Sequence, residues 1–502
     1  MTRFFVFVLL TATIALGTGL PSSPASVDQT QPVTFNKDVL PILQNNCQVC
    51  HRPGGIGPMS FMAYETTRPW AKGIKAAVLS RHMPPWFADP QYGEFRNAPK
   101  LTASDIGTLV AWADTGAREG EAADRPADRQ WPSGWRIKPD IVVSTPEPYY
   151  VPASGAGEIH EFTIPNPFKQ DTWVTSIEIR PSNPSVVHHV IVKIPDQPPL
   201  PGAGPPPSGP SGAQGVVSKG RCADCSAAAV QNAVLALDAR RADGRIRQDG
   251  GSYSDVFARM LERQTGRGAF TTMEAVYAPG SPPQDFRFTN SAKLVRAGKP
   301  IRIEVHYTPN GKATTDQTRV GFALARSPAQ RRFVIMAPEH LVDSRKPIPA
   351  GEANWETKGE LTFTQDAELA WFMPHMHLRG KDMTFRLIYP NGREETVLSA
   401  KFNFHWQLGY ELEKPIKVPK GTRMIVTAHH DNSANNPDNP EPGKSVVWGE
   451  MTGQEMMLPW FGVVIENDAP PASIAFYKPG DFDGPARPLL RVTTPAITVV
   501  TQ

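Results

Sequence analysis

Prolines and glycines interrupt the chain at short intervals along almost its entire length. There are 52 prolines and 40 glycines among 502 residues, and they are scattered between apolar runs rather than confined to one tract. A proline inside a helix removes a hydrogen bond and clashes with the preceding turn. The pattern therefore excludes a long-helix or coiled-coil protein and favours β-rich domains joined by many turns.

Length and charge restrict the possibilities further. At about 100 to 200 residues per domain, the chain has room for three or four packed units. The formal net charge is only +3 and basic runs are absent, so we expect no nucleic-acid partner.

The N-terminal 25 residues have the composition of a secretory signal peptide. Arg3 precedes an apolar stretch at 4–20, and small and turn-forming residues follow. We therefore expect residues 1–25 to be a signal peptide and the protein to be exported, to the periplasm or beyond. The alternative is an uncleaved anchor, because the apolar run is near the lower length limit for spanning a bilayer. We expect no later membrane span.

The segment Cys47-Gln48-Val49-Cys50-His51 is the attachment motif of a c-type haem. Two thiols bond covalently to the porphyrin, and the following histidine supplies an axial imidazole to the iron. Haem is attached in this way outside the cytoplasm, which agrees with export. We therefore expect one covalent haem c, held by Cys47, Cys50 and His51.

A small helical domain is predicted around this motif. Three segments have short helical patterns: 36–46, 70–80 and 102–115. The last begins with Thr102 and Asp105, spaced as in a capping box. We predict an all-α haem domain over 30–117, followed by a polar linker at 118–135.

The sixth iron ligand is expected on a loop that faces His51. Met83 is the preferred candidate, because it follows the 70–80 helix and two prolines restrain it. His82 is the main competitor, and Met59 is too close to His51 in sequence to reach the opposite haem face. A packing role for Met83 remains the alternative.

From residue 136 onward the chain consists of short apolar runs bounded by Pro, Gly, Asn or Asp. Examples are 173–179, 190–194, 301–307, 383–389 and 424–427. These runs predict two all-β sandwich domains, over 136–335 and 336–495. A Pro/Gly-rich stretch and an Ala/Arg-rich stretch predict an insertion in the first domain at about 195–268.

Ten histidines lie in this β-rich part, and six of them form three clusters: His188-His189, His375-Met376-His377 and His429-His430. In the 301–307 strand, His306 lies on the face opposite the apolar side chains. His375 and His377 are two apart, so both project from one face of a strand. The adjacent His188 and His189 share a metal only at a strand end or a bulge, and the upstream Pro184 favours a strand start there.

The types of these side chains indicate the metal. A lone histidine is usually a surface or hydrogen-bonded core residue, but three clusters together favour metal binding. Sets rich in imidazole with a thioether suit copper, whereas zinc more often recruits carboxylate or thiolate.

The arrangement resembles the copper type II, ascorbate-dependent monooxygenases, which include peptidylglycine α-hydroxylating monooxygenase and dopamine β-monooxygenase. Four motifs match in order: Val187-His188-His189-Val190, Val305-His306-Tyr307-Thr308, Pro374-His375-Met376-His377 and Gly453-Gln454-Glu455-Met456. The resemblance covers about 136–490 and implies two jelly-roll-like domains with one copper in each. The N-terminal part looks like the cytochrome c domain that is fused to such modules in bacterial proteins.

The resemblance also implies roles for the matched residues. One copper, for electron transfer, is held by His188, His189 and His306. The other, which binds O2 and substrate, is held by His375, His377 and Met456. The implied activity is hydroxylation of a C–H bond of a small organic substrate. We further expect an external electron donor, an ascorbate-like reductant or a redox protein, whose electrons pass through the haem to the first copper.

Two other functions remain open. One is electron transfer or copper binding without oxygen activation, with which every proposed ligand is also compatible. The other is a structural or carbohydrate-associated module with a cytochrome appended, which the ordered four-motif match disfavours.

The sequence departs from the peptide-amidating members of the family at two positions that help to hold the substrate carboxylate. An arginine and a tyrosine of those members are replaced here by Met373 and Trp460. A peptide C-terminus is therefore a poor substrate. Together with Trp371 and Phe372, these residues suggest either an apolar substrate or core packing.

Two further groups have no settled role. Cys222-Ala223-Asp224-Cys225 lacks a following histidine and so is not a second haem motif. A local disulfide, a redox pair and a metal site remain open for it. His429 and His430 are interpreted as support for a metal ligand or as surface residues, with an alternative copper ligand as the third possibility.

Overall fold

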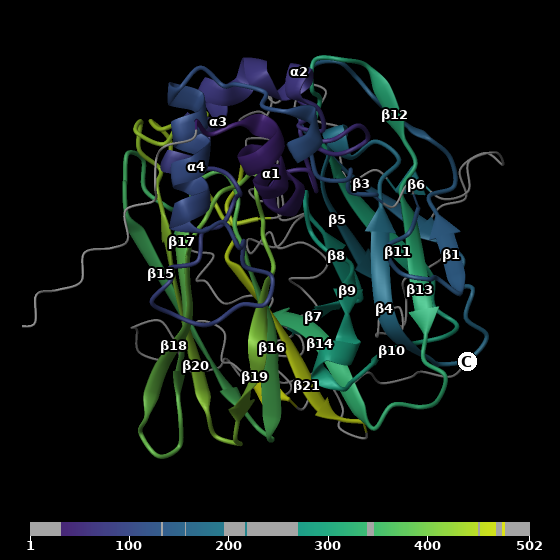
Figure 1. Ribbon diagram of the computed structural model, residues 1–502. Helices are drawn as coiled ribbons and strands as arrows, with labels where there is room; N and C mark the ends of the chain where they lie inside the picture. The colour runs from purple at the N-terminus through teal and green to yellow at the C-terminus, as the bar shows by residue number, and fades with distance from the viewer. Residues whose placement is uncertain are drawn as a thin grey trace, which may run out of the picture.

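The computed structural model describes residues 32–131, 134–155, 157–194, 216–217, 270–338, 346–449, 452–467 and 474–476. This part of the chain is mostly β-sheet with few helices, and the helices gather at one end of the β-sheets (Figure 1). The expected signal peptide, the Cys222/Cys225 pair and nearly all of the 195–268 insertion lie outside it. Within the described ranges, no helix is long and apolar enough to cross a membrane.

Four short α-helices precede and follow the Cys47–His51 motif in sequence. They are α1 (Leu40–Asn46), which continues a π-helical turn at Phe35–Val39, α2 (Tyr64–Thr67), α3 (Ala71–Leu79) and α4 (Ala103–Asp114). The capping box at the start of α4 is formed: Thr102 Oγ1 accepts from the Asp105 N–H, and the Asp105 carboxylate accepts from the Thr102 N–H. An apolar core that includes Leu43, Leu109 and Trp112 joins these helices.

Two five-stranded antiparallel sheets form what we call the first β-unit. One has the order β1 (Ile141–Ser144), β13 (Arg319–Leu324), β4 (Thr172–Arg180) and β10 (Lys293–Val295), with β9 (Gln284–Asp285) also beside β4. The other has the order β6 (Val216–Val217), β3 (Glu158–Ile164), β11 (Ile301–Tyr307), β5 (Val187–Lys193) and β8 (Ala275–Tyr277). β2 (Tyr149–Val151) pairs with β12 (Thr314–Asp316). Alternate apolar side chains of both large sheets fill one core.

Two more five-stranded antiparallel sheets form the second β-unit. One has the order β19 (Tyr410–Val418), β16 (Ala367–His375), β21 (Leu458–Glu466), β14 (Arg331–Pro338) and β7 (Phe270–Met273). The other has the order β18 (Glu394–Lys401), β17 (Gly380–Ile388), β20 (Arg423–His430), β15 (Trp355–Phe363) and β22 (Ala475–Phe476). The five strands expected from the apolar runs are present as β4, β5, β11, β17 and β20.

One sheet of the second β-unit is buried on both faces. In β14, Val334 and Met336 pack into the core of the second β-unit, whereas Phe333 and Ile335 pack into that of the first. The expected division at 335/336 therefore falls within a strand that serves both cores. The two β-units share this sheet as a common wall.

The same wall explains the apolar residues beside the HxH motif. Met373 and Trp460 are register partners on β16 and β21. Both lie, with Trp371, in the core of the first β-unit, while Phe372 points into the core of the second. Of the two interpretations of these residues, the structure places them in core packing.

The helical region is joined to the second β-unit by the segment 86–98. Isolated bridges connect Ala88 with Ala400 and Phe95 with Leu412. The Trp86 and Phe95 rings also meet Tyr410 edge-on, at 5.0 and 5.6 Å between centroids. This segment belongs in sequence to the expected haem domain but completes the core of the second β-unit.

The described part of the expected linker is packed against the helices. The Gln44 side chain donates to the Ala127 carbonyl at 3.0 Å, and Arg129 donates to the Gln44 carbonyl at 3.0 Å. The guanidinium groups of Arg52 and Arg129 lie 5.0 and 4.7 Å from the Trp131 ring. These contacts join the described linker residues to α1 and to Arg52, the residue after the Cys47–His51 motif.

Candidate metal centre

Three histidines of the first β-unit meet at a β-bulge. In the pairing of β5 with β11, His306 lies opposite His189 and Tyr307 lies opposite Val187, so His188 is the extra residue. The strand begins just after a 3-10 turn at Pro184–Val186. The expected strand start is therefore present, a bulge coincides with it, and the two adjacent imidazoles both lie close to His306.

One ring nitrogen each of His188, His189 and His306 lies within 4.8 Å of the other two. His188 donates its Nε2–H to the Phe404 carbonyl at 2.6 Å, and its Nδ1 lies 3.1 Å from Nδ1 of His189. Among the described residues, Nδ1 of His306 is buried without a hydrogen-bond partner. A metal ion is the natural partner for such converging buried nitrogens.

Burial keeps these imidazoles neutral. It lowers the pKa of His188 to about 4, and it lowers the pKa of His189 and of His306 well below the usual 6.5, with the neighbouring histidines adding to the effect. A neutral imidazole has a free lone pair, and this is the form that binds a metal. The electrostatics of the first set therefore fit a ligand role.

The second set comes from the second β-unit. We expected one strand to carry both histidines, but β16 ends at His375 and His377 lies just beyond it. Met376, between them, is buried in the core of the second β-unit, and both imidazoles lie on the other side. Their ring centroids are 5.5 Å apart, as the spacing of two residues predicts.

Each imidazole of the second set has one nitrogen engaged by the protein. Nδ1 of His375 donates to Oε1 of Gln407 at 2.6 Å, and Nδ1 of His377 donates to the Gln454 carbonyl at 3.2 Å. Burial lowers the pKa of His377 to about 3. These contacts assign the proton to Nδ1 in both rings and leave Nε2 for a metal.

A buried carboxylate fixes the backbone around the second set. Glu455 is fully buried, and its oxygens accept from the backbone N–H groups of His377, Arg379 and Met456. Burial raises the pKa of Glu455 to about 7, against the effect of these donors. The glutamate therefore holds the backbone N–H groups of Met456 and His377 at one carboxylate oxygen.

The two sets are neighbours. The ring centroids of His189 and His375 are 6.0 Å apart, and the loop between β18 and β19 reaches both sets through Phe404 and Gln407. Motif reasoning did not identify either of these loop residues. A signal for them exists in the sequence Asn403-Phe404-His405-Trp406-Gln407, which gathers aromatic and polar side chains between two strands.

The remaining histidine cluster lies beside the second set and has its own protein partners. Nδ1 of His429 lies 2.6 Å from the Asp382 carboxylate. His430 is buried, and its Nε2 lies 3.5 Å from the Met456 carbonyl. Its contact with the backbone of Met456 places His430 in a supporting position.

The haem motif has the features of an axial histidine site. Nδ1 of His51 donates to the Met59 carbonyl at 3.3 Å, which leaves Nε2 for iron, and the Phe61 ring stacks on the imidazole at 4.4 Å. Cys47 and Cys50 are free thiols, and burial raises the pKa of Cys47 to about 12. The residue set fits covalent haem attachment.

The expected sixth ligand lies after α3. The Met83 backbone N–H donates to the Ala77 carbonyl at 3.2 Å. The other nearby methionine, Met59, packs against the helical core, as does Cys47. Ligation of iron by Met83 stays a prediction.

The motif also adjoins the first β-unit. A Cβ added at Gly280 would lie 3.5 Å from Sγ of Cys50. Burial, with the nearby Cys50, raises the pKa of Tyr277. Tyr277 lies on β8 opposite Val190 of β5, the residue next to His189. A short run of contacts thus links the haem motif to the first histidine set.

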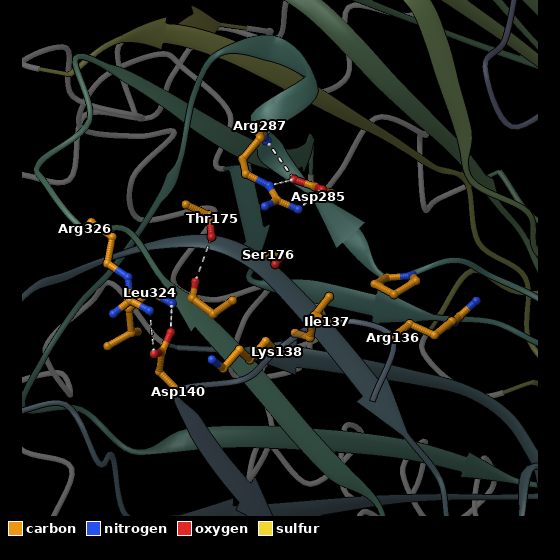
Figure 2. A pocket seen from close by; sticks show the side chains of 12 residues that line it. Arg136, Ile137, Lys138, Asp140, Thr175, Ser176, Asp285, Arg287, Leu324 and Arg326 are labelled. Atoms are coloured by element: carbon orange, nitrogen blue, oxygen red, sulfur yellow. Dashed lines mark hydrogen bonds and ion pairs between the residues drawn. The ribbon is translucent and has the colours of Figure 1, made fainter. Parts of the chain in front are cut away.

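A separate cleft of about 590 Å³ lies on the other sheet of the first β-unit, beside β4 and β13 (Figure 2). Its wall includes four basic side chains, of Arg136, Lys138, Arg287 and Arg326. Arg326 pairs with Asp140 at 3.3 Å and Arg287 pairs with Asp285, so much of this charge is balanced. The cleft contains none of the expected ligands.

Comparison with known proteins gives little further information. No family model and no curated protein matches the chain. A solved structure of an infectious bursal disease virus particle with T13 symmetry is 7% identical over 68% of this chain and 76% of that chain, with a TM-score of 0.14. A structure of the Gx strain of the same virus is 9% identical over 69% and 77%, with a TM-score of 0.12. At such scores neither likeness bears on fold or function.

Proposed function

We propose that this chain is an exported, copper-dependent monooxygenase that hydroxylates a C–H bond of a small organic substrate with O2. The observation that carries the proposal is the meeting of two imidazole sets, His188/His189/His306 and His375/His377, with ring centroids of His189 and His375 only 6.0 Å apart. Two jelly-roll-like domains, a haem c in the helical domain and two copper ions belong to the same proposal.

The chain's own residues prepare these sites. The Phe404 carbonyl and Oε1 of Gln407 each accept from one imidazole, which sets its tautomer and aims the other nitrogen. Copper supplies one-electron redox chemistry when it is bound to such ligands, and the thioether of Met456 favours its reduced state. Glu455 keeps the backbone of Met456 next to that of His377.

Electron supply is assigned to the haem motif. Cys50 lies against the β8 region, and β8 pairs with the strand that carries His188 and His189. We therefore place the entry of electrons at Cys47–His51, with Met83 as the sixth iron ligand. The donor is an external ascorbate-like reductant or a redox protein.

Copper and haem stoichiometry tests the proposal. The protein is purified from an exporting, haem c-competent host and loaded with copper, and elemental analysis and haem absorbance are measured on one sample. We expect two copper ions per haem, and O2 consumption when a reductant and a suitable substrate are added. Absence of tightly bound copper would remove the oxygenase assignment.

A second function is favoured by the depth of the site. His189, His306, His375 and His377 are all less than 8% exposed, which suits electron transfer better than admission of a large substrate. An electron-transfer protein would bind both coppers and reoxidise its haem, yet consume no O2 beyond the background rate of free copper.

A further inference from the structure

The loop between β18 and β19 contacts one histidine of each set. On one side, the Phe404 carbonyl accepts from Nε2 of His188 at 2.6 Å, and the Phe404 ring stacks on the His188 ring at 4.7 Å and 24°. On the other side, Oε1 of Gln407 accepts from Nδ1 of His375 at 2.6 Å. A segment of the second β-unit thus orients a ligand of the first.

The loop is short and internally bonded. Oδ1 of Asn403 accepts from the His405 N–H at 2.9 Å, and the Asn403 carbonyl accepts from the Trp406 N–H at 3.0 Å. Gln407 is only 3% exposed. Gln407 and Phe404 thus lie three residues apart in one hydrogen-bonded turn.

We propose that the loop Asn403–Gln407 couples the two histidine sets, with Gln407 as a positioning residue, so that each set binds copper most tightly when the other is correctly formed. This inference rests on the proposed function, since it concerns the same two sites. In other proteins, removal of a side chain that hydrogen-bonds to a metal ligand typically lowers the metal affinity about 10- to 100-fold.

The test uses full-length, haem-loaded protein, stripped of copper and titrated with Cu(I) against a chromogenic chelator. Two backgrounds isolate the sets: His306→Ala leaves the second set as the reporter, and His377→Ala leaves the first. Gln407→Leu removes the acceptor at similar size, and Gln407→Glu retains it. Gln170→Leu, at an exposed glutamine before β4, is the matched control.

We expect Gln407→Leu to lower Cu(I) affinity about 10- to 100-fold in the His306→Ala background. In the His377→Ala background we expect a loss of about fivefold or more, the lower end of typical coupling between sites. Gln407→Glu should restore most of the affinity in both, and Gln170→Leu should change neither. Circular dichroism of each variant confirms that the chain has folded.

Each contrary result has a distinct meaning. Unchanged affinity in the His306→Ala background would show that Gln407 does not position the second set. A loss confined to that background would show that the two sets are independent and would overturn the coupling. Intact coupling together with no O2 consumption by the wild type would leave this inference standing and remove the oxygenase assignment instead.

Discussion

The imidazole rings of His189 and His375 lie 6.0 Å apart between centroids and nearly perpendicular, at 89°. One ring comes from β5 of the first β-unit and the other from β16 of the second. The ligands of the two expected copper ions are thus assembled at a single junction. The shared wall and the β18–β19 loop both contribute contacts to this geometry.

Removal of His306 should eliminate one metal ion and leave the other groups in place. His306 supplies a buried nitrogen that has no hydrogen-bond partner among the described residues, so His306→Ala removes a ligand without breaking a protein contact of that nitrogen. We expect copper to fall from two ions per haem to one in elemental analysis, with unchanged haem absorbance. The control His429→Ala should keep both ions, and two ions in the His306 variant would place the first copper elsewhere.

Glu455→Gln should destabilise the fold around the second set. The carboxylate accepts from three backbone N–H groups, and the substituted amide has only one acceptor oxygen. Leaving buried donors unpaired costs about 1–3 kcal/mol, which denaturant unfolding would measure. The exposed Glu394→Gln should change the free energy of unfolding by less than about 0.5 kcal/mol. Equal stability of wild type and Glu455→Gln would contradict the role of this carboxylate.

Local patterns predicted only part of the first histidine set. Pro184 favoured a strand start beside the adjacent pair His188-His189, and β5 begins at Val187 with a bulge at this pair. The Thr102/Asp105 capping box was predictable for the same reason, since both features depend on neighbours in sequence. Such features follow from spacing and local hydrogen bonding alone. The grouping of His306 with the histidine pair came from the family resemblance.

Contacts between the units were not predictable from the same patterns. Met373 and Trp460 are apolar, which fits either a substrate site or a hydrophobic core. Only the burial of both faces of their sheet shows that they belong to a core. Phe404 and Gln407 contact the metal ligands through a backbone carbonyl and a side-chain amide. No sequence spacing predicts either contact, because the partners are far apart in sequence and meet only where one β-unit packs on the other.

The buried His160 should make stability depend on pH. It lies 4.5 Å from both Tyr149 and Phe162 between ring centroids, and burial lowers its pKa from the usual 6.5. Just below pH 6.5 the unfolded chain takes up a proton that the folded chain resists, so the free energy of unfolding falls as pH falls. We expect His160→Leu to reduce that slope in denaturant unfolding measured on either side of pH 6.5.

One control makes this pH test specific. Gln170→Leu, at an exposed residue that does not titrate, should leave the slope of the wild type unchanged. A His160→Leu protein with the wild-type slope would assign the pH dependence to other buried histidines.

Gly57→Ala should disturb the axial histidine of the haem motif. A Cβ at this position would lie 2.5 Å from Nδ1 of His51, so the imidazole must move away from the Met59 carbonyl. The thioether bonds that we propose for Cys47 and Cys50 do not depend on this contact, so we expect covalent haem to remain while its iron ligation weakens. The absorption spectrum and the reduction potential should both differ from those of the wild type.

A second glycine separates this effect from a general one. Gly73 lies inside α3 with no atom within 4 Å of an added Cβ. Gly73→Ala should therefore stabilise the protein by about 0.5–1 kcal/mol, because alanine loses less backbone entropy in a helix, and it should leave the haem spectrum unchanged. If Gly57→Ala also left the spectrum and the potential unchanged, His51 would not be an iron ligand held by Met59, and the entry of electrons through this motif would have to be abandoned.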